Sequence, residues 1–512
     1  MGTTTETRNA LGALADIVMP HLAGEPVKIP RGLAHLSSAH DAELVGHPLS
    51  ATLLPFQRAG VAYALEARRA MIAHDMGLGK TIQAIATLMA TATYPALIVV
   101  PPTLAINWEK EFAKWAPEVT TARLVGQTPG ELPDTDVWII GDSVVSHWHE
   151  AIIAAGPAAL VIDESQRMKN RSAKRTKACL EISRKIPSDG LVLLLTGTAI
   201  KANNGELLPQ IQILGTEDLF GGVYDYLARY FPKVDRWSRQ SANNVELFNI
   251  MSDSFYARLE FDDVKYQFAE AGMITPEGVA RSSVAVELTG KAGTDYSKAR
   301  DDLRRFLIET RGERKADSAM RAEALTRMGV LRHLIGLAKI PGTVEYVRNL
   351  VDDGEQVIVF AWHRDVVDGI VEKLAAKKIE AGKIYGGMKV EQVEQNKARF
   401  QDGEIKVIVL NIEAGSVGHT LTAAANVVFN EFAWSPEDMR QAEARANRLG
   451  QSRQVLSHWM AGANGQVTID ERLFEIINDK ALVTGATLNG KATTMIDSES
   501  VTNALLDWAE FG

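Results

Sequence analysis

Cysteine is almost absent from this sequence of 512 residues, with Cys179 as the single example. An intrachain disulfide framework is therefore excluded, and a reducing compartment is favoured. The chain also has no excess of positive charge. It contains 55 Lys and Arg and 64 Asp and Glu, which gives a formal net charge of −9. That balance excludes a protein that holds nucleic acid through bulk positive charge, while a local basic groove stays open as an alternative.

Long hydrophobic runs are missing as well. The most apolar stretch, residues 151–162, is interrupted by Gly156 and Pro157 and is too short to span a bilayer. The first residues, Met-Gly-Thr-Thr-Thr-Glu, lack a basic segment followed by an apolar one, so we expect no signal peptide. We therefore expect a cytoplasmic protein without membrane contact, and the length favours two or three domains.

Two stretches of the chain alternate short apolar runs with amphipathic segments such as Thr81–Met89 and Leu104–Trp115, which are long enough for helices. Runs rich in Val and Ile in this setting are typical of buried parallel strands in βα units. The pattern therefore predicts two α/β lobes. The strand-like runs of the first stretch are Ala70–Ala73, Ala96–Val100, Val137–Ile140, Leu160–Ile162 and Leu191–Leu195, and those of the second are Val357–Phe360, Val407–Leu410, Val427–Phe429 and Val455–Trp459.

Between these stretches strand-like runs are rare and charges are frequent. Residues 298–332 contain ten Lys or Arg and six Asp or Glu. Such a run is either a solvated helical face or a helical insertion that presents arginines to a phosphate backbone. Near the C-terminus, Leu505, Leu506, Trp508 and Phe511 form a helix-like apolar stripe that we expect to pack on the body of the protein. The predicted domains are an N-terminal extension (1–48), a first lobe (49–204), a mainly helical insertion (205–344), a second lobe (345–484) and a C-terminal tail (485–512).

A glycine-rich loop between the run at Ala70–Ala73 and the following helix has the context of a phosphate-binding loop. Glycines allow the backbone N–H groups of such a loop to close around phosphate oxygens, and the N-terminus of the following helix adds partial positive charge. Lys80 neutralises the β- and γ-phosphates in such a loop, and the Thr81 hydroxyl is a ligand for Mg²⁺. His74 stands where the general pattern has its first glycine. A glycine-rich turn without a ligand is the alternative. The loop itself reads Asp75, Met76, Gly77, Leu78, Gly79, Lys80, Thr81.

Two carboxylates and two threonines follow the next strand-like runs. Asp163 and Glu164 come directly after Leu160–Ile162, at the end of a strand where an open α/β sheet collects ligand groups. We expect Asp163 to hold Mg²⁺ and Glu164 to orient and deprotonate the attacking water. After Leu191–Leu195, the sequence Thr196-Gly197-Thr198 offers hydroxyls that can sense the γ-phosphate. Each motif alone is also typical of an ordinary loop, and the order of the series gives it weight.

The second lobe contains an arginine-rich segment, Gln441–Gln451, which reads as a helix ending at Gly450. At that spacing Gln441, Arg445 and Arg448 lie on one helical face. Arginines from a second lobe can bind the γ-phosphate bidentately as charge develops on it. A surface helix with ordinary arginines is the alternative. The preceding loop contains Gly418 and Thr422, and its amides and hydroxyl suit phosphate contact, from nucleotide or nucleic acid.

Taken in order, these motifs resemble the superfamily-two helicase core, and specifically the Swi/Snf-type branch of double-stranded DNA translocases. The resemblance covers most of the chain. Without a cysteine cluster for a zinc module, a bacterial or phage protein fits better than a chromatin remodeller. Two further segments, LRHLIGLAKI (331–340) and EFAWSP (431–436), resemble the compact annealing-helicase (HARP-like) subgroup. The motifs of the core are LPFQ (54–57), DMGLGKTIQA (75–84), IVVPPTLAINWEKEFAKW (98–115), VIDESQRMKN (161–170), LLLTGT (193–198), VIVFAWHRDVVDGI (357–370), AGSVGHTLTAA (414–424) and QAEARANRLGQ (441–451).

The resemblance implies two RecA-like lobes with parallel sheets that bind ATP and Mg²⁺. By its motifs, the catalytic residues are Lys80, Asp163, Glu164, Arg445 and Arg448, and the Mg²⁺ ligands are Thr81 and Asp163. ATP binding is implied for Gln57, which matches the adenine-reading glutamine, for 75–81, and for Gly418 and Gln441. Coupling of nucleotide state to DNA is implied for Gln166, Thr196, Gly197 and Thr198. Three residues depart from those common at their positions, Gln166, Ala199 and Asn447, and none of them removes a catalytic group.

For DNA, the resemblance implies a duplex held mainly through phosphate contacts. Trp108 and Trp362 add aromatic rings that can stack on bases, although Trp108, Phe112 and Trp115 also fall at helical spacing, which favours core packing. The candidate DNA-binding residues are Thr103, Lys169, Arg171, His363, Arg364 and Thr422.

These features predict an ATP-dependent translocase on double-stranded DNA that couples ATP hydrolysis to fork remodelling, strand annealing or displacement of bound protein. A strand-separating helicase is one alternative, and a catalytically silent scaffold for nucleic acid or a polymerase is another. A P-loop kinase or metabolic ATPase leaves the second lobe unexplained. The expected partners are double-stranded or forked DNA and a replication or repair protein. We expect a monomer in the cytoplasm, associated with the nucleoid, or in the host cytoplasm for a phage protein.

Overall fold

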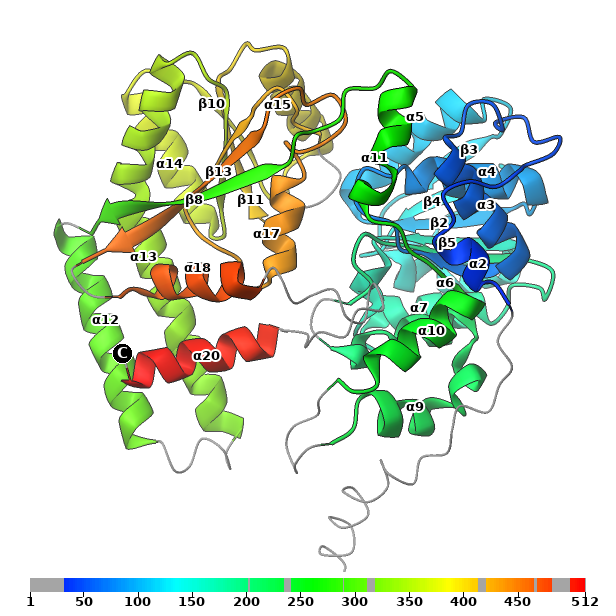
Figure 1. Cartoon of the computed structure of the whole chain (residues 1–512), viewed down its shortest axis with the longest axis horizontal. Coiled ribbons are helices and arrows are strands. Elements are labelled where there is room, and N and C mark those ends of the chain that lie inside the picture. The colour runs from blue at the N-terminus through cyan, green and yellow to red at the C-terminus, as the bar shows by residue number, and fades with distance from the viewer. Residues whose placement is uncertain are drawn as a thin grey trace, which may run out of the picture. The chain divides into compact units, whose positions relative to one another are not determined.

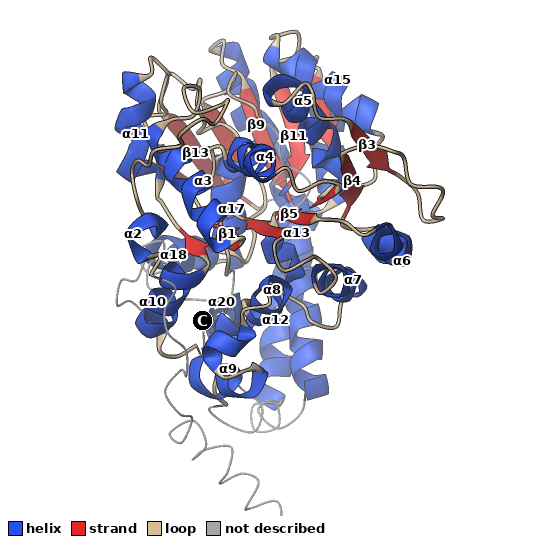
Figure 2. Ribbon diagram, turned by 90° about the vertical axis from the view of Figure 1, so that its right-hand side faces the viewer, coloured by secondary structure: helices blue, strands red, loops and turns tan. Residues whose placement is uncertain are grey.

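The chain forms two compact units that divide between Ala271 and Gly272. Unit 1 precedes this point, and unit 2 follows it and includes the last helix. Each unit has its own parallel sheet with helices around it (Figures 1 and 2). The computed structural model describes residues 32–200, 203–233, 241–288, 290–310, 318–412, 420–464, 467–480 and 498–511.

Unit 1 contains a seven-stranded sheet in the order β3-β4-β2-β5-β6-β1-β7, in which every strand pair is parallel. The central strands are almost completely buried, which explains their continuous runs of Val, Ile and Leu. The strands are β1 (Arg69–Ile72), β2 (Ala96–Val100), β3 (Thr121–Leu124), β4 (Val137–Gly141), β5 (Ala159–Asp163), β6 (Leu191–Leu195) and β7 (Tyr256–Ala257).

Helices of unit 1 begin where the sequence offers start signals. Pro55 opens α3, and Gln57 closes a capping box with the Leu54 backbone. The helices are α2 (Ala34–Ser37), α3 (Pro55–Ala67), α4 (Lys80–Thr91), α5 (Ala105–Trp115), α6 (Val145–Ala155), α7 (Lys174–Ser183), α8 (Leu208–Leu214), α9 (Val223–Tyr230), α10 (Asn244–Ser254) and α11 (Phe261–Glu270), with short 3₁₀ turns η1 (Pro102–Leu104), η2 (Ser165–Met168), η3 (Asn204–Glu206) and η4 (Glu217–Phe220).

Unit 2 contains a six-stranded sheet in the order β10-β11-β9-β12-β13-β8, again parallel throughout. Its strands are β8 (Val279–Glu287), β9 (Val357–Ala361), β10 (Ala381–Ile384), β11 (Val407–Asn411), β12 (Asn426–Phe429) and β13 (Val455–Ala463). Its helices are α12 (Gly290–Glu309), α13 (Ser318–Asp352), α14 (Arg364–Ala376), α15 (Val390–Gln401), α17 (Pro436–Glu443), α18 (Ile469–Lys480) and α20 (Ser498–Phe511).

The predicted fold class is confirmed: two parallel sheets, with a mainly helical segment between the core motifs of the two lobes. Every strand expected from an apolar run is present. However, that segment also supplies β7 to the first sheet and β8 to the second. The boundary drawn at 344 lies inside α13, a helix of 35 residues that contains Pro341. The division at Ala271 was not expected from composition, because β8 is an edge strand with half-exposed polar residues and lacks an apolar run.

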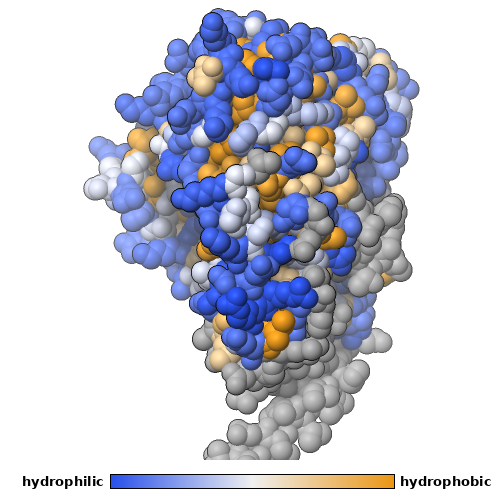
Figure 3. All heavy atoms as spheres, turned by 90° about the vertical axis from the view of Figure 1, so that its left-hand side faces the viewer, coloured by the Kyte–Doolittle hydropathy of each residue, from blue (hydrophilic) through white to orange (hydrophobic). Residues whose placement is uncertain are grey.

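Two further expectations from the sequence concern surfaces. The charged run over residues 298–332 forms exposed ion pairs, such as Arg305–Asp302 at 3.4 Å and Arg327–Glu323 at 2.9 Å, as a solvated helical face does. Hydrophilic side chains likewise cover most of the face in Figure 3. The apolar stripe near the C-terminus packs as expected, because Leu505 and Leu506 on α20 are buried in the core of unit 2. None of the described helices has the length and apolarity needed to cross a membrane.

Candidate nucleotide and nucleic-acid sites

The predicted phosphate-binding loop connects β1 to α4. Gly77 and Gly79 have φ angles of 84° and 70°, in the left-handed region that glycine adopts without strain. Lys80 is the first residue of α4, and its Nζ donates hydrogen bonds to the carbonyl oxygens of His74 at 2.8 Å and Asp75 at 3.0 Å. The lysine therefore bridges the loop from within, and the first turn of α4, which includes Thr81, follows directly.

Lys80 shares its surroundings with the two predicted catalytic carboxylates. Withdrawal from water lowers the pKa of Lys80 to about 8 from its ordinary 10.5, while Glu164, Asp163 and Asp75 act to raise it. Withdrawal from water and repulsion from Glu164 raise the pKa of Asp163 to about 6, against an ordinary 3.8. These mutual effects show that the structure brings Lys80, Asp163 and Glu164 together, although they come from different elements.

Asp163 is the last residue of β5, and Trp108 holds its carboxylate. The indole Nε1 of Trp108 donates a hydrogen bond to Asp163 Oδ2 at 2.9 Å, and Asp163 Oδ1 accepts one from the Glu164 N–H at 2.9 Å. Trp108 is completely buried and packs against Phe112, with ring centroids 6.1 Å apart. Core packing is therefore the right alternative for Trp108, and base stacking is wrong. Its hydrogen bond to Asp163 was missed from the sequence, because helical spacing carries no signal for it.

Glu164 has an unusual backbone conformation, with a φ angle of 50° in the left-handed region. Such a conformation costs a non-glycine residue about 1 kcal/mol or more and is concentrated at functional sites. It turns the chain sharply after β5 into η2. The carboxylate of Glu164 accepts a hydrogen bond from Gln166 Nε2 at 2.6 Å.

The predicted coupling residues form a continuous chain of hydrogen bonds. Gln166 Oε1 accepts from the Thr196 hydroxyl at 2.7 Å, and Thr196 Oγ1 accepts from the Thr198 N–H at 2.9 Å. A side chain at Gly197 would place its Cβ 3.0 Å from Met76 Cγ and 3.9 Å from Lys80 Nζ. Glycine there allows the Thr-Gly-Thr loop to close on the phosphate-binding loop. The structure thus connects Glu164 with the loop after β6.

Arg258 is a second residue that the sequence did not reveal. Its guanidinium donates to the carbonyl oxygens of Ala73 at 2.7 Å and Gly197 at 3.2 Å, and to Asp75 Oδ1 at 2.7 Å. It fastens the phosphate-binding loop to the loop that follows β6. Because Arg258 and Asp75 are separated by 183 positions in the chain, no local pattern could have indicated the pair.

Gln57 and His74 lie behind the phosphate-binding loop. Gln57 Nε2 donates to the Leu78 carbonyl at 3.4 Å, and a Cβ at Gly79 would lie 2.5 Å from that nitrogen. The amide that we expect to read adenine is thus held against the loop. His74 is buried where the general pattern has glycine, and burial lowers its pKa to about 3, so the ring is neutral. Gly60 on α3 leaves room for this ring, because a Cβ at that position would lie only 3.0 Å from His74 Nε2.

The arginine-rich segment of unit 2 differs from the expected helix. Helix α17 starts with a hydrogen bond from the Asp438 N–H to Ser435 Oγ at 3.3 Å and ends at Glu443, so the predicted helix to Gly450 is wrong. Two contacts explain the early end. Glu443 is buried in an ion pair with Arg281 at 2.6 Å, and the Arg445 carbonyl accepts from the Leu421 N–H at 2.9 Å.

The predicted ATP ligands of unit 2 consequently do not share one helical face. Gln441 is in α17, while Arg445 and Arg448 follow it in turns. Gln441 and Arg445 are buried, and Arg448 donates to the Thr420 hydroxyl at 2.9 Å on the surface. Gly418 lies outside the described residues. The roles of these residues in ATP hydrolysis stay predictions.

The candidate DNA-binding residues occupy both units. In unit 1, Thr103 and Arg171 are exposed, and Lys169 pairs with Glu206 at 3.0 Å. In unit 2, Arg364 donates to the Gly386 carbonyl at 2.7 Å, and its guanidinium lies 4.4 Å from the centroid of the Tyr385 ring.

The other two candidates of unit 2 also have partners. His363 Nδ1 contacts the buried Glu431 carboxylate at 2.6 Å, and the Thr422 carbonyl accepts from Gln451 Nε2 at 3.2 Å. Contact with DNA stays a prediction for all six residues.

Comparison with known families agrees with this arrangement. The SNF2-related domain matches residues 56–271, which contain the phosphate-binding loop, the carboxylate pair and Arg258. The helicase conserved C-terminal domain matches residues 342–450. The chain thus contains a SNF2-related domain followed by a helicase conserved C-terminal domain. A SNF2-related domain implies that this part of the chain binds a nucleotide.

Relatives of this chain include a DNA annealing helicase and endonuclease. It is 31% identical over 466 residues to the DNA annealing helicase and endonuclease ZRANB3 of Mus musculus, covering 86% of this chain and 41% of that protein. It is 29% identical over 460 residues to the SWI/SNF-related matrix-associated actin-dependent regulator of chromatin subfamily A-like protein 1 of Xenopus laevis, covering 87% of this chain and 44% of that protein. The chain thus spans less than half the length of these relatives.

Among solved structures, the Sulfolobus solfataricus SWI2/SNF2 ATPase core in complex with dsDNA is 21% identical. The alignment covers 91% of this chain and 96% of that one, with a TM-score of 0.39.

Proposed function

We propose that this protein is a DNA-dependent ATPase that translocates on double-stranded DNA and remodels it, by fork remodelling, strand annealing or displacement of bound protein. The observation that carries the proposal is the meeting of Lys80, Asp163 and Glu164 next to a glycine loop at the start of α4. The names of the relatives, which include a DNA annealing helicase, support DNA as the partner. The expected compartment is the one that holds the DNA, with the protein acting as a monomer alongside a replication or repair partner.

Hydrolysis requires water to attack the γ-phosphorus while the bond to the β,γ-bridging oxygen breaks. Glu164 accepts the proton of the attacking water, and the hydrogen bond from Gln166 at 2.6 Å orients its carboxylate. Lys80 neutralises the β- and γ-phosphates, for which it exchanges its hydrogen bonds to the carbonyls of His74 and Asp75. Arg445 and Arg448 are the proposed ligands for charge that develops on the γ-phosphate.

Mg²⁺ fits the residues present. Its proposed ligands, the Asp163 carboxylate and the Thr81 hydroxyl, are the hard oxygen donors that Mg²⁺ prefers. A cation next to Asp163 also offsets the repulsion from Glu164 that raises the pKa of this carboxyl. Among the described residues no group of three or more His, Cys, Asp or Glu forms a ready metal site, and Mg²⁺ in phosphoryl transfer takes most ligands from phosphate and water. Bound there, Mg²⁺ neutralises charge on the phosphates.

The test is steady-state ATP hydrolysis without nucleic acid and with single-stranded DNA, blunt duplex and a model fork. Lys80→Ala is the negative variant, because it removes the side chain that we propose to neutralise the phosphates. Thr87→Val is the matched control in the same helix, since Thr87 only donates to the Gln83 carbonyl at 2.8 Å. We expect hydrolysis that duplex or forked DNA stimulates, that Lys80→Ala abolishes and that Thr87→Val preserves.

Each other outcome corresponds to an alternative. Stimulation by single strands alone favours a strand-separating helicase. Equal hydrolysis with and without any DNA overturns the translocase proposal. Absence of Lys80-dependent hydrolysis under every condition favours the silent scaffold.

A further inference from the structure

Glu164 and the turn η2 that follows it, residues 164–168, are anchored to the rest of unit 1 on three sides. We call these residues the catalytic turn. One anchor is the hydrogen bond between Gln166 and the loop after β6. A second is buried, because Ser165 Oγ donates to Gln210 Oε1 on α8 at 2.9 Å. A non-glycine residue keeps a left-handed conformation only where its surroundings fix it, so each anchor contributes to the orientation of Glu164.

The third anchor is an ion pair with the loop after β4. Arg167 Nε donates to Asp142 Oδ2 at 2.5 Å, and the backbone N–H of Arg167 donates to the Glu164 carbonyl at 2.9 Å. Arg167 thus closes the turn on Glu164 with its main chain and fastens the turn to another loop with its side chain. Charge-assisted hydrogen bonds are shorter and stronger than neutral ones, and of the three anchors this is the charged one.

Asp142 is held firmly beside the catalytic turn. Its side chain is 1% exposed, and its N–H donates to the Val100 carbonyl at the end of β2 at 2.7 Å. The neighbouring Gly141 lets the loops after β2 and β4 approach closely, since a Cβ there would lie 3.2 Å from Pro102 Cγ. Asp142 Oδ1 is buried without a hydrogen-bond partner among the described residues. The carboxylate therefore makes its contacts through Oδ2.

The same oxygen also accepts from a second arginine, Arg175. Its Nη1 lies 2.8 Å from Asp142 Oδ2, and the side chains of both arginines are 37% exposed. One buried carboxylate thus compensates two guanidinium groups, which repel each other without it. Arg175 belongs to α7, whereas Arg167 is part of the catalytic turn. The two arginines therefore share a partner and differ in the element that each one fastens.

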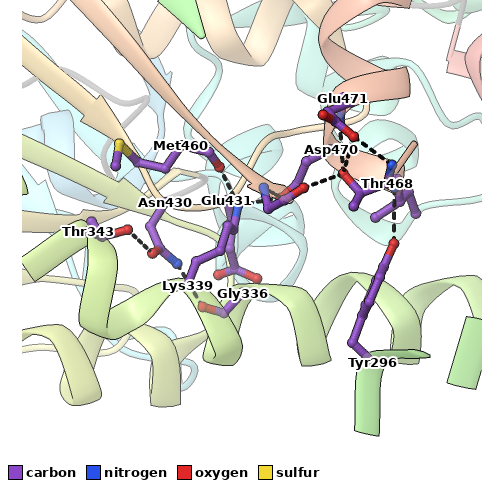
Figure 4. Close-up of polar contacts among 12 residues, drawn as sticks. Tyr296, Gly336, Lys339, Thr343, Asn430, Glu431, Met460, Thr468, Asp470 and Glu471 are labelled. Carbon is purple, nitrogen blue, oxygen red and sulfur yellow. Dashed lines mark hydrogen bonds and ion pairs between the residues drawn. The ribbon is translucent and has the colours of Figure 1, made fainter. Parts of the chain in front are cut away.

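A buried ion pair of unit 2 shows the contrasting case. Lys339 Nζ contacts Asp470 at 2.6 Å, between α13 and the start of α18, and donates to the Met460 carbonyl at 2.7 Å (Figure 4). That pair joins core elements, and neither helix carries a proposed catalytic residue. The pair between Asp142 and Arg167 includes a residue of the catalytic turn instead.

We propose that Asp142 is a positioning residue for ATP hydrolysis that acts through Arg167 on the orientation of Glu164. The proposal rests on the proposed function, in which Glu164 accepts the proton of the attacking water. A misplacement of about 1 Å in a catalytic group can lower the rate about a hundredfold, so loss of the ion pair lowers kcat. The phosphate-binding loop is not part of the pair, so KM for ATP changes little.

The experiment measures steady-state ATP hydrolysis by the full chain, without DNA and at saturating blunt duplex, for Arg167→Gln and Asp142→Asn. Arg175→Gln is the matched control, because it removes the other guanidinium from the same carboxylate oxygen and leaves the catalytic turn paired. Each arginine variant leaves Asp142 with one cation, so neither leaves the buried charge unpaired. Thermal unfolding and the affinity for a fluorescent ADP analogue verify the fold of each variant.

We expect Arg167→Gln to lower kcat about 10- to 100-fold, with and without DNA, while KM for ATP changes less than about twofold. Arg175→Gln should keep kcat within about twofold of the wild-type value. Asp142→Asn should lower kcat as Arg167→Gln does, and the double variant should lose no more than either one, because the two residues act as a unit. If Asp142→Asn does not fold, the comparison of the two arginine variants decides.

Three results would overturn the proposal. Equal losses of kcat in Arg167→Gln and Arg175→Gln would make the ion pair a structural clamp. A wild-type kcat in Arg167→Gln would show that the anchor does not orient the base. An effect confined to the duplex concentration that gives half-maximal stimulation would make Arg167 a contact for DNA. A wild-type protein without any hydrolysis overturns the proposed function as well.

Discussion

The indole of Trp108 donates a hydrogen bond of 2.9 Å to the carboxylate of Asp163. This contact links a buried core residue to the carboxyl group that we propose as a ligand of Mg²⁺. It acts against the two effects that raise the pKa of Asp163, withdrawal from water and repulsion by Glu164. The pH range in which Asp163 is ionised therefore depends on the packing of α5.

The ATPase should have a bell-shaped pH profile of kcat/KM for ATP at saturating DNA. Asp163 must be ionised, and its pKa is raised to about 6, so activity falls as the pH drops through about 6. Lys80 must be protonated, and its pKa is lowered to about 8, so activity falls again as the pH rises through about 8. Lys80→Arg keeps its charge at high pH and should lose the upper limb. A wild-type profile that is flat from about pH 5 to pH 9 contradicts both assignments.

Trp108→Phe should move the lower limb of that profile upward. The variant removes the hydrogen bond that stabilises the ionised Asp163, so its pKa rises above about 6, and a shift of roughly half to one pH unit is expected. Phe112→Leu is the control, because Phe112 packs on Trp108 but has no group that can donate to Asp163. An equal shift in both variants would mean that packing and not the hydrogen bond sets the midpoint.

Thr196→Val should lower kcat about 10- to 100-fold with little change in KM for ATP. The hydroxyl holds Gln166 at 2.7 Å, and Gln166 in turn orients Glu164, so its loss misplaces the proposed base without touching the phosphate-binding loop. Steady-state kinetics measures both constants. Thr87→Val, which removes another buried hydroxyl from the same unit, should leave kcat unchanged. A rise in KM with unchanged kcat is the result that rejects this relay.

Lys339→Met should destabilise unit 2 by about 3–5 kcal/mol, because it leaves the Asp470 carboxylate buried without its cation. Lys339→Met combined with Asp470→Asn should recover most of that loss. The side-chain amide of Asn at position 470 can still accept the hydrogen bond that the Gly462 N–H donates to Asp470 at 3.1 Å. Denaturant unfolding, followed by hydrogen exchange of α13 and α18 amides, isolates the transition of unit 2. Strictly additive effects of the two substitutions would show that the pair is not coupled.

Sequence patterns found the central strands because a parallel strand buried on both faces has to be apolar throughout. The sequence patterns missed the edge strands β3, β7, β8 and β10, because one side of each has no neighbouring strand. On β8, for example, Arg281 and Ser282 leave no apolar run. The sequence pattern placed the end of α17 too late, because the Arg445 carbonyl accepts a hydrogen bond from the N–H of Leu421, a residue distant in the chain, and so does not continue the helix.

Motif order pointed to Lys80, Asp163 and Glu164, which the structure places together, because residues at the ends of neighbouring parallel strands converge on one edge of the sheet. Contacts between distant segments carry no such signal. Arg258 reaches Asp75 across 183 positions, and the glycine at 336 is explained only by the nearby Glu431 carboxylate. The same limit applies to Trp108, whose spacing predicted its burial and not its hydrogen bond.

The place of β13 in its sheet has a practical consequence for expressing parts of the protein. The helicase conserved C-terminal domain match stops at residue 450, but β13 begins at Val455 and lies between β12 and β8, pairing with both. A recombinant fragment that ends at residue 450 would lack β13, so β12 and β8 would each have an unpaired edge and apolar side chains would be exposed. Such exposed strand edges promote aggregation. A fragment meant to isolate the second unit should therefore start at Gly272, before β8, and retain α20 at its other end.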